Sequence, residues 1–441
     1  MTLPKSHNYD PRHVFDVMVI GSGISGMAAS LFSVNRKLST VQAGSAGGTL
    51  FTSGLLDLIG VYPLEEKRLW KNPWEALDAM RADGSQHPYT RLGNNRISDA
   101  FNELIEFLGS VGMRFRCGGD HNLEVITSMG TVKDTYCVPE SMWHCVDAYE
   151  EKAPCLFVDF RGLKEFSARQ ISSALRSEWP ATRTLRVAFP GTEGRNEVHA
   201  AHLARALEMA GVREALTEAI RPEIGDARYV GFPAVLGIKR TPAIIEHLGK
   251  LLGVPVFEIP MMPASVPGFR LKELFDTELP RRGLLRLIDK RVESVNRTDN
   301  GNFLLAIGGN DETVLIQARA VVLATGRFMG KGLISDRKGI YEPIFNLPLH
   351  QPEGRLAWHH KEFLHPGGHP VNRAGVEVDD CFRPVDAGGT VVHENLFAAG
   401  SILAHQDWMR MKCGSGLAIA TAYAAVNACI DTLKKKDGEI G

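Results

Sequence analysis

The stretch "VFDVMVIGSGISGMAAS", from Val14 to Ser30, decides the expected fold of this chain. An apolar run enters a turn in which Gly21, Gly23 and Gly26 have the spacing GxGxxG, and small residues follow. This order predicts a buried strand, a tight turn and a helix. The next apolar run, "LSTVQAG", predicts a second strand, so the chain opens with a strand–helix–strand unit.

The glycine turn predicts a site for a phosphate-bearing cofactor. Gly21 permits the tight turn, Gly23 lets a phosphate approach the backbone, and Gly26 lets the helix pack closely on the strand. The free N–H groups at the helix N-terminus and the helix dipole both favour an anion there. The alternative interpretation is a purely structural turn between strand and helix.

The end of the second strand bears on which cofactor is bound. Dinucleotide-binding folds usually place an acidic residue there, about 20 residues after the glycines, on a ribose hydroxyl. This chain has Gln42 and Ala43 instead. The sequence therefore favours FMN, whose single phosphate suits the glycine turn, and keeps FAD as the alternative.

Composition excludes several classes of protein. The chain has 441 residues, 44% of them hydrophobic, which is enough for two or three domains. A net charge of -1 predicts no nucleic-acid partner. We find no apolar run of the ~18 residues that span a membrane, and the polar N-terminus does not resemble a secretory signal. Seven cysteines form no CxxC pair, so we expect no cysteine-ligated metal site and assign no other metal site. Their odd number and the absent secretory signal predict reduced thiols and a cytoplasmic protein.

The middle of the chain predicts a separate unit. Helical stretches alternate there with strand candidates at 155–160, 185–191, 229–237 and 254–260. Such alternation favours a parallel sheet. The predicted fold class is therefore α/β. A Rossmann-like flavin-binding domain is assembled from both chain ends, residues 14–100 and 268–441, with an inserted α/β domain over 101–267.

Further glycine turns follow apolar strands near the C-terminus. "VVLATG" ends at Thr325 and Gly326, "NLFAAG" ends at Gly400, and "CGSGLA" opens a long helix for which Ser415 is the expected N-cap. Their order after the first turn resembles flavoproteins with two dinucleotide-binding motifs. These include the fumarate reductase and glycerol-3-phosphate dehydrogenase groups.

Other segments resemble one family, the B subunits of anaerobic glycerol-3-phosphate dehydrogenase. They are "FTSGLLDL" at 51–58, "HPYTRLG" at 87–93, "MGTVKDTY" at 129–136, "MPASVPGFRL" at 262–271, "KGLISDRKGIYEPIFNL" at 331–347 and "VDDCFRPVDAGG" at 378–389. The resemblance covers nearly the whole chain. The stretch "AHQDWMRMK" at 404–412 departs from it, being bulkier and more basic than the expected glycine-rich loop.

The resemblance implies a flavin-containing subunit of a multi-subunit enzyme. Such an enzyme oxidises sn-glycerol 3-phosphate to dihydroxyacetone phosphate and passes the electrons to the quinone pool. The implied cofactor is FMN, and the implied partners are a sister flavoprotein subunit and an iron–sulfur subunit. Contact with the membrane is then expected only through a partner.

Two sets of site residues follow from these patterns. For the cofactor we expect Gly21, Ser22, Gly23, Ser25, Gly26, Ser45, Ser53, Gly54, Thr325, Gly326, Gly400, Gly414, Ser415 and Gly416. For catalysis we expect Arg270 and Arg327 as cations for the substrate phosphate, and His405 as the base. Further candidate cations are Lys331, Arg337, Arg410 and Lys412. Cys413 is either a packing residue or a thiol activated by the helix N-terminus.

The residues leave the role of the chain open. No single segment joins a base to cations, so the chain either oxidises substrate or relays electrons. A stand-alone FAD oxidoreductase of the fumarate reductase type, acting on another small acid, is the first alternative. A docking scaffold without flavin is the second.

Overall fold

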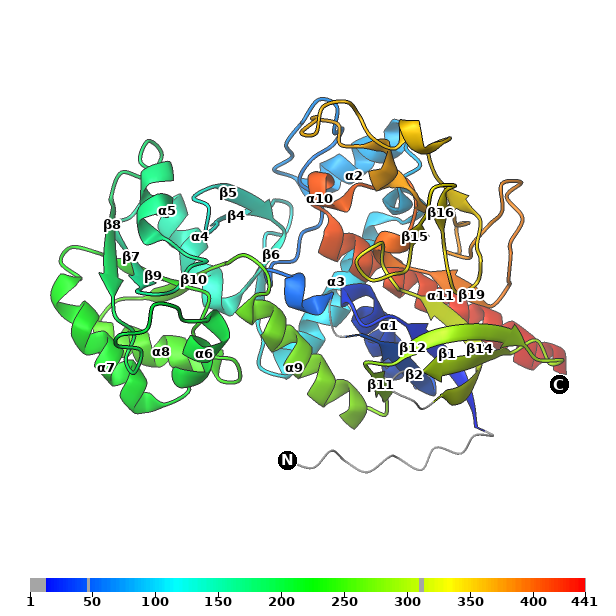
Figure 1. Ribbon diagram of the computed structural model, residues 1–441, viewed down its shortest axis with the longest axis horizontal. Coiled ribbons are helices and arrows are strands. Elements are labelled where there is room, and N and C mark those ends of the chain that lie inside the picture. The colour runs from blue at the N-terminus through cyan, green and yellow to red at the C-terminus, as the bar shows by residue number, and fades with distance from the viewer. Residues whose placement is uncertain (1–12, 46–47, 309–312, 441) are drawn as a thin grey trace.

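The computed structural model describes residues 13–45, 48–308 and 313–440. The polar N-terminal stretch, on which the expectation of no secretory signal rests, lies outside these residues. The described chain forms two lobes that lie side by side, each with its own sheet and its own hydrophobic core (Figure 1).

The first lobe is built on a seven-stranded sheet in the order β11-β2-β1-β14-β13-β12, with β19 paired to β14. Its strands are β1 (Val14–Ile20), β2 (Thr40–Gly44), β11 (Leu285–Ile288), β12 (Arg291–Arg297), β13 (Phe303–Gly308), β14 (Val314–Leu323) and β19 (Leu396–Ala398). β1 lies parallel to both β2 and β14, and β14 lies parallel to β19. Strands from both ends of the chain are therefore neighbours, as the sequence predicted.

Helices cover this sheet. Of the helices of this lobe, α1 (Ile24–Asn35) and α11 (Gly414–Ile440) pack on the sheet. The others are α2 (Pro73–Ala82), α3 (Asn94–Ser110) and α10 (Trp408–Met411). α11 packs against α1 and α3, and its small Ala422 and Ala425 are fully buried. By length and composition α11 could cross a membrane, which corrects the expectation that no apolar run was long enough. However, 67% of its apolar window is buried inside the protein, as in the core helix of a globular fold.

The second lobe contains the predicted parallel sheet. Its order is β10-β9-β7-β8, formed by β7 (Cys155–Phe160), β8 (Thr182–Val187), β9 (Tyr229–Pro233) and β10 (Val256–Ile259). Every residue of β7 is buried, because helices pack on both faces of such a sheet. The surrounding helices are α4 (Trp143–Glu150), α5 (Ala168–Ala174), α6 (Ala200–Ala206), α7 (Ala210–Ile220) and α8 (Thr241–Leu252).

The chain crosses between the lobes later than the sequence suggested. The expected boundary at residue 101 falls within α3, whose buried residues belong to the first core. The crossing follows through β3 (Phe115–Cys117), β4 (Leu123–Ile126), β5 (Val132–Thr135) and β6 (Cys137–Pro139), and the chain returns through α9 (Val266–Arg281). Four two-residue strands complete the first lobe: β15 (Ile334–Ser335), β16 (Ile340–Tyr341), β17 (Leu349–His350) and β18 (Gly375–Val376).

Two of the cysteines are joined at this crossing. Cys117 and Cys137 lie opposite each other on β3 and β6 and form a disulfide, which corrects the expectation that all thiols are reduced. The other five cysteines are free.

Candidate functional site

The first glycine turn has the close contacts that its spacing predicts. Gly21 has φ of +125°, and a Cβ atom there would lie 2.2 Å from the carbonyl oxygen of Ala324. A Cβ atom at Gly26 would lie 2.1 Å from the carbonyl oxygen of Gly21. Only glycine allows β1, β14 and α1 to approach this closely.

Gly23 differs from its two neighbours because the space beside it is open. It is the N-cap residue of α1, and a Cβ atom there would meet no atom within 4 Å. Among the residues that the structure describes, no side chain caps the first N–H groups of α1. The Ser22 hydroxyl donates to the carbonyl of Ser45 at 2.6 Å, which holds the loop after β2 against the turn. Together, free N–H groups and free space at a helix N-terminus suit a phosphate.

Two more turns meet the first one at the carboxyl ends of β14 and β19. Gly326 and Gly400 both have positive φ, and a Cβ atom at Gly400 would lie 2.7 Å from the Cβ of Ser25. Among the described residues, the hydroxyls of Ser25 and Thr325 are buried without a hydrogen-bond partner. Buried hydroxyls normally have partners, so these two point to a polar ligand. Ligands of such sheets bind at this end of the strands.

Gln42 holds the place where an acidic ribose ligand is expected, but its amide is engaged inside the protein. Its Nε2 donates to the Gly21 carbonyl at 3.0 Å, and its Oε1 accepts from the Nε of Arg286 at 3.0 Å. The side chain is 1% exposed. Gln42 therefore braces the glycine turn against β11 and offers no free carboxylate to a ribose.

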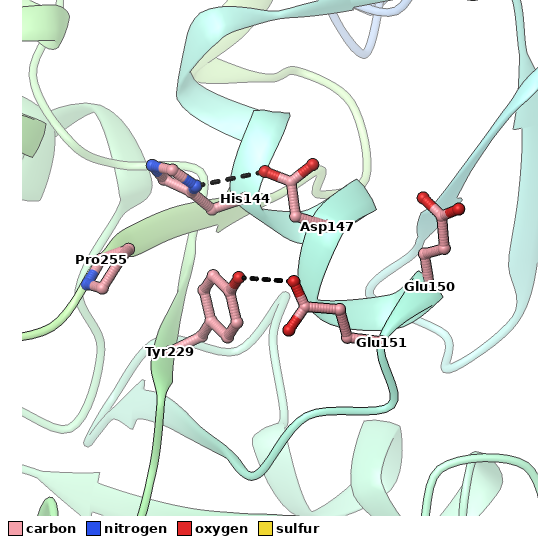
Figure 2. A pocket seen from close by; sticks show the side chains of 6 residues that line it. All are labelled: His144, Asp147, Glu150, Glu151, Tyr229 and Pro255. Atoms are coloured by element: carbon pink, nitrogen blue, oxygen red, sulfur yellow. Dashed lines mark hydrogen bonds and ion pairs between the residues drawn. The ribbon is translucent and has the colours of Figure 1, made fainter.

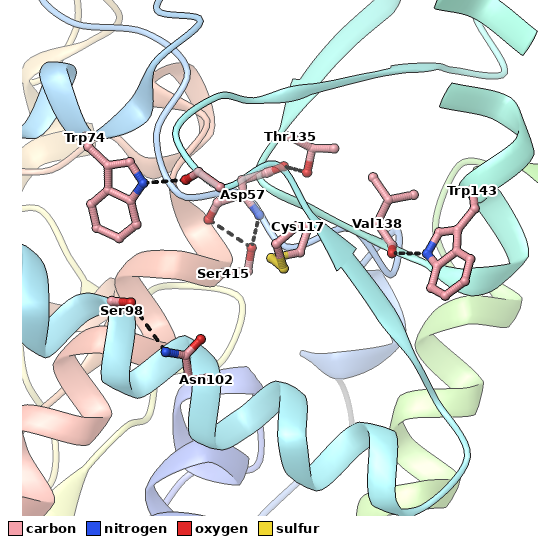
Figure 3. The surroundings of a disulfide bond; sticks show 11 residues. Asp57, Trp74, Ser98, Asn102, Cys117, Thr135, Val138, Trp143 and Ser415 are labelled. Atoms are coloured by element: carbon pink, nitrogen blue, oxygen red, sulfur yellow. Dashed lines mark hydrogen bonds between the residues drawn. A yellow bond between two sulfur atoms is a disulfide. The ribbon is translucent and has the colours of Figure 1, made fainter. Parts of the chain in front are cut away.

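The turn that opens α11 is already in contact with another loop. The Gly416 N–H donates to the carbonyl of Asp57 at 2.7 Å, and the Ser415 hydroxyl accepts from the Asp57 N–H at 2.6 Å (Figure 3). α11 begins at Gly414, so the prediction of Ser415 as its N-cap is wrong. A Cβ atom at Gly416 would lie 2.5 Å from the Tyr89 hydroxyl. Binding of a cofactor by Gly414, Ser415 and Gly416 stays a prediction.

Ser53 and Gly54 lie where the first lobe meets α9. The Ser53 hydroxyl accepts from the Leu55 N–H at 3.4 Å. Gly54 has φ of +84°, and a Cβ atom there would lie 2.7 Å from the Cβ of Pro267. The Ser265 hydroxyl caps α9 by accepting from the Gly268 N–H at 3.0 Å. The "SVPGFRL" segment thus packs directly on the "TSG" turn.

Arg270 lies in a buried ion pair and is not free for a substrate. Its two terminal nitrogens contact the Glu258 carboxylate at 2.6 and 2.7 Å, and its Nε donates to the Gly237 carbonyl at 2.9 Å. Glu258 is fully buried and Arg270 is 7% exposed. This corrects the expectation of a phosphate-binding role, because the cation joins α9 to the second lobe.

Arg327 is also engaged by the protein. Its terminal nitrogens donate to the carbonyls of Ala374 and Val371 at 2.6 and 2.7 Å. Burial lowers the pKa of its guanidinium to about 10. The guanidinium that we expected to bind a substrate phosphate therefore already donates from both terminal nitrogens to backbone carbonyls.

His405 lies beside two residues that the sequence did not single out. Its Nε2 is 2.8 Å from the Oε1 of Glu377, and its ring centroid is 4.2 Å from that of His350. His350 and Glu377 belong to no local motif with His405. They meet because β17 pairs with β18, which sequence patterns of two-residue strands do not reveal.

The remaining candidates are dispersed. Arg410 pairs with Asp407 at 3.0 Å, Lys412 packs against Gly60, and Lys331 and Arg337 are exposed. Cys413 is fully buried, and burial raises the pKa of its thiol well above the usual value. The interpretation of Cys413 as a packing residue is therefore confirmed.

A separate open pocket of about 550 Å³ lies on the second lobe (Figure 2). It is lined by His144, Asp147, Glu150, Glu151, Tyr229 and Pro255. Four of its polar side chains form two pairs: His144 with Asp147 at 3.3 Å, and Tyr229 with Glu151 at 3.3 Å. None of the residues predicted for the site lines it.

Comparison with known proteins supports a flavin-binding fold. The family described as "FAD binding domain" matches residues 16–417. A Halobacterium salinarum protein, named as a probable B subunit of anaerobic glycerol-3-phosphate dehydrogenase, is 31% identical over 433 residues, covering 95% of this chain and 98% of the relative. A Vibrio cholerae protein, named as the B subunit of that enzyme, is 28% identical over 429 residues, covering 95% and 97%. The family match confirms the Rossmann-like fold and flavin binding.

Solved structures show a more distant likeness. The 3-ketosteroid delta1-dehydrogenase from Sterolibacterium denitrificans has a TM-score of 0.43 and 12% identity, covering 95% of this chain and all of that one. A flavocytochrome c3 fumarate reductase has a TM-score of 0.42 and 10% identity, covering 96% of this chain and 79% of that one. The fold is established by the strand order and the family match, and not by these two distant structures.

Proposed function

Since this chain belongs to the FAD binding domain family and to the family of anaerobic glycerol-3-phosphate dehydrogenase B subunits, we propose that it relays electrons within such a dehydrogenase. The whole enzyme oxidises sn-glycerol 3-phosphate to dihydroxyacetone phosphate and delivers the electrons to quinone. Another subunit removes the electrons from the substrate, and this chain carries a flavin that passes them on.

One observation supports the relay role above the others: the candidate substrate-binding cations have internal partners. Oxidation of glycerol 3-phosphate requires cations free to meet the phosphate and a base at the C2 hydroxyl. Arg270 is bound to Glu258, and Arg327 is bound to two backbone carbonyls. The two arginines expected to bind the substrate phosphate are therefore used in holding the fold.

The first three glycine turns fit a flavin. The open space at Gly23 and the first N–H groups of α1 would hold its phosphate, and the unpartnered hydroxyls of Ser25 and Thr325 lie buried beside the same turns. When bound, the flavin supplies the electron-transfer chemistry, and the protein supplies binding and orientation.

The flavin in this proposal is FMN. The AMP half of FAD would need a partner for its ribose at the end of β2, and both ends of the Gln42 amide are already bound there. Denaturing the purified protein and chromatographing the released cofactor tests this point. Stoichiometric FMN is expected, and stoichiometric FAD would overturn the choice of FMN while leaving the relay role intact.

The proposed partners are a sister flavoprotein subunit and an iron–sulfur subunit. The relatives are named as B subunits, which implies that further subunits exist. The cysteines of this chain form no CxxC pair, so the iron–sulfur cluster is assigned to another subunit. We place the complex in the cytoplasm, with any membrane contact made through a partner.

Anaerobic mixing with substrate tests the relay role. The isolated chain, loaded with its flavin, and the intact complex are each mixed with sn-glycerol 3-phosphate while the visible flavin absorbance is followed. The complex is expected to lose absorbance quickly and the isolated chain to keep it, while dithionite reduces both as a control. Reduction of the isolated chain at the rate of the complex would overturn the proposal.

A further inference from the structure

Three side chains from three separate segments meet at one edge of the first lobe. β17 pairs with β18 in antiparallel register, so that His350 lies opposite Gly375, and Glu377 follows directly after β18. The Ala404 N–H donates to the Val376 carbonyl at 3.0 Å and lays the segment before His405 beside the same strand. Backbone pairing thus brings His350, Glu377 and His405 together.

The donor atoms of these side chains are close enough to share one ion. The Oε1 of Glu377 lies 2.8 Å from the Nε2 of His405 and 3.6 Å from the Nδ1 of His350. One ligand atom from each residue lies within 4.8 Å of the other two. A tetrahedral zinc ion with bonds of about 2.0–2.1 Å holds its ligands about 3.4 Å apart. The distances from the Glu377 Oε1 to the two histidine nitrogens, 2.8 and 3.6 Å, lie on either side of that value.

We propose that His350, Glu377 and His405 form a binding site for one divalent transition-metal ion of the zinc class. Two imidazoles and one carboxylate are ligands that Zn²⁺ accepts, whereas Mg²⁺ and Ca²⁺ prefer oxygen ligands alone. The side chain of His405 is 13% exposed, while those of Glu377 and His350 are 36% and 41% exposed. The site is closed on the His405 side and open on the other, where water can supply the fourth ligand.

The backbone at His405 is fixed in a way that suits a metal ligand. His405 has φ of +62°, which is uncommon outside glycine, and its N–H donates to the Arg373 carbonyl at 2.9 Å. The next residue, Gln406, donates from Nε2 to the carbonyls of Ser401 and Leu403. Such a conformation persists where its surroundings enforce it. The His405 ring is thereby held toward Glu377 before any ion arrives.

The metal site gives His405 a role other than the predicted base. An imidazole nitrogen that ligates a metal has no lone pair left to accept a proton from a substrate. The sequence predicted no metal site because these ligands are far apart along the chain and share no motif. The inference uses only the geometry of the three side chains and does not rest on the relay role.

Metal titration of the full, untagged chain tests the site. The protein is stripped with a chelator and then titrated with Zn²⁺ and, separately, with Co²⁺. We expect one equivalent of each to bind, and the visible bands of bound Co²⁺ to report a four-coordinate site. His350→Ala and Glu377→Gln are each expected to weaken Zn²⁺ binding about 100-fold or more.

Two further variants serve as controls for specificity and for folding. His365→Ala is the matched control, because His365 stacks on His360 with centroids 3.9 Å apart in a different loop, and it should bind Zn²⁺ as the wild type does. His405→Asn keeps a residue that tolerates positive φ, and its metal-free Tm should match the wild type while the Zn²⁺-induced rise in Tm is lost. Absence of stoichiometric binding by the wild type, or equal binding by all four variants, would overturn the inference. Neither result affects the flavin reduction experiment.

Discussion

The Ser415 hydroxyl accepts a 2.6 Å hydrogen bond from the backbone N–H of Asp57, which joins the last helix of the chain to a loop near its beginning. The Asp57 carboxylate in turn accepts from the Nζ of Lys133 at 2.8 Å. It also accepts from the hydroxyl of Thr135 at 2.8 Å (Figure 3). Asp57 therefore connects α11 to the β4–β5 hairpin, because its N–H and carbonyl bind α11 and its carboxylate binds β5.

Removing the Ser415 hydroxyl should weaken this junction. Ser415→Ala leaves the Asp57 N–H without its partner, which costs about 1 kcal/mol of unfolding free energy. Urea denaturation of wild type and variant measures the change. Ser98→Ala is the control, because that hydroxyl only accepts a weak bond of 3.4 Å at the surface. If both substitutions change stability equally, the junction contributes nothing of its own.

Two glycines of the first turn should respond differently to the same substitution. Gly23→Val adds a side chain where no atom lies within 4 Å, so the flavin should be lost while the Tm matches that of the flavin-free wild type. Gly26→Val forces a side chain against the Gly21 carbonyl, so both Tm and flavin content should fall. Thermal unfolding and the flavin absorbance per protein measure the two properties. Full flavin content in Gly23→Val would place the phosphate elsewhere.

The Arg270–Glu258 pair should act on stability and not on flavin binding. Arg270→Met leaves a buried carboxylate without its cation and should lower the unfolding free energy by about 3–5 kcal/mol. The double variant Arg270→Met with Glu258→Gln removes the charge, keeps an acceptor for the Leu236 N–H, and should recover most of the loss. Both variants should keep their flavin. A double variant no more stable than Arg270→Met would contradict this explanation.

His87 should make the protein acid-sensitive. Its side chain is fully buried, and burial, with smaller contributions from His405 and Arg373, lowers its pKa from 6.5 to about 3. The unfolded chain therefore binds a proton that the folded chain does not, and stability falls as pH drops from about 6.5 toward 3, by up to about 1.4 kcal/mol per pH unit.

The variant His87→Asn isolates this effect. Asparagine can still accept from the Tyr89 N–H, as His87 does at 3.1 Å, but it does not titrate. Unfolding free energies measured between pH 4.5 and 7 should then depend less steeply on pH than in the wild type. Equal slopes in wild type and His87→Asn would mean that His87 does not titrate as described.

Much of the fold follows from local patterns in the sequence. Gly21 and Gly26 are required by steric contacts within one turn. Their spacing, with the apolar run before them and the small residues after them, predicted strand, turn and helix. The strands of the second lobe were placed within a few residues by their apolar runs. The neighbouring positions of β1 and β14 followed from glycine turns at both chain ends.

The parts that were missed depend on tertiary contacts between distant segments. Arg270 resembled a substrate-binding cation until the fold placed it on Glu258. The disulfide required the pairing of β3 with β6, and the cluster around His405 required the pairing of β17 with β18. The charge and hydrophobicity of single residues carry no signal for such partners, because each partner is chosen by the folded backbone.

The seam between α9 and the "TSG" turn makes the two lobes thermodynamically dependent on each other. Pro267 rests on Gly54, and the Ser265 hydroxyl donates to the carbonyl of Thr52, so the second lobe cannot shift without moving a segment expected to contact the cofactor. In the proposed complex, we therefore expect a subunit that favours one placement of the second lobe to alter flavin affinity. By reciprocity, flavin binding will alter the affinity for that neighbour by the same factor. Assembly of the complex and retention of its cofactor then become one linked equilibrium.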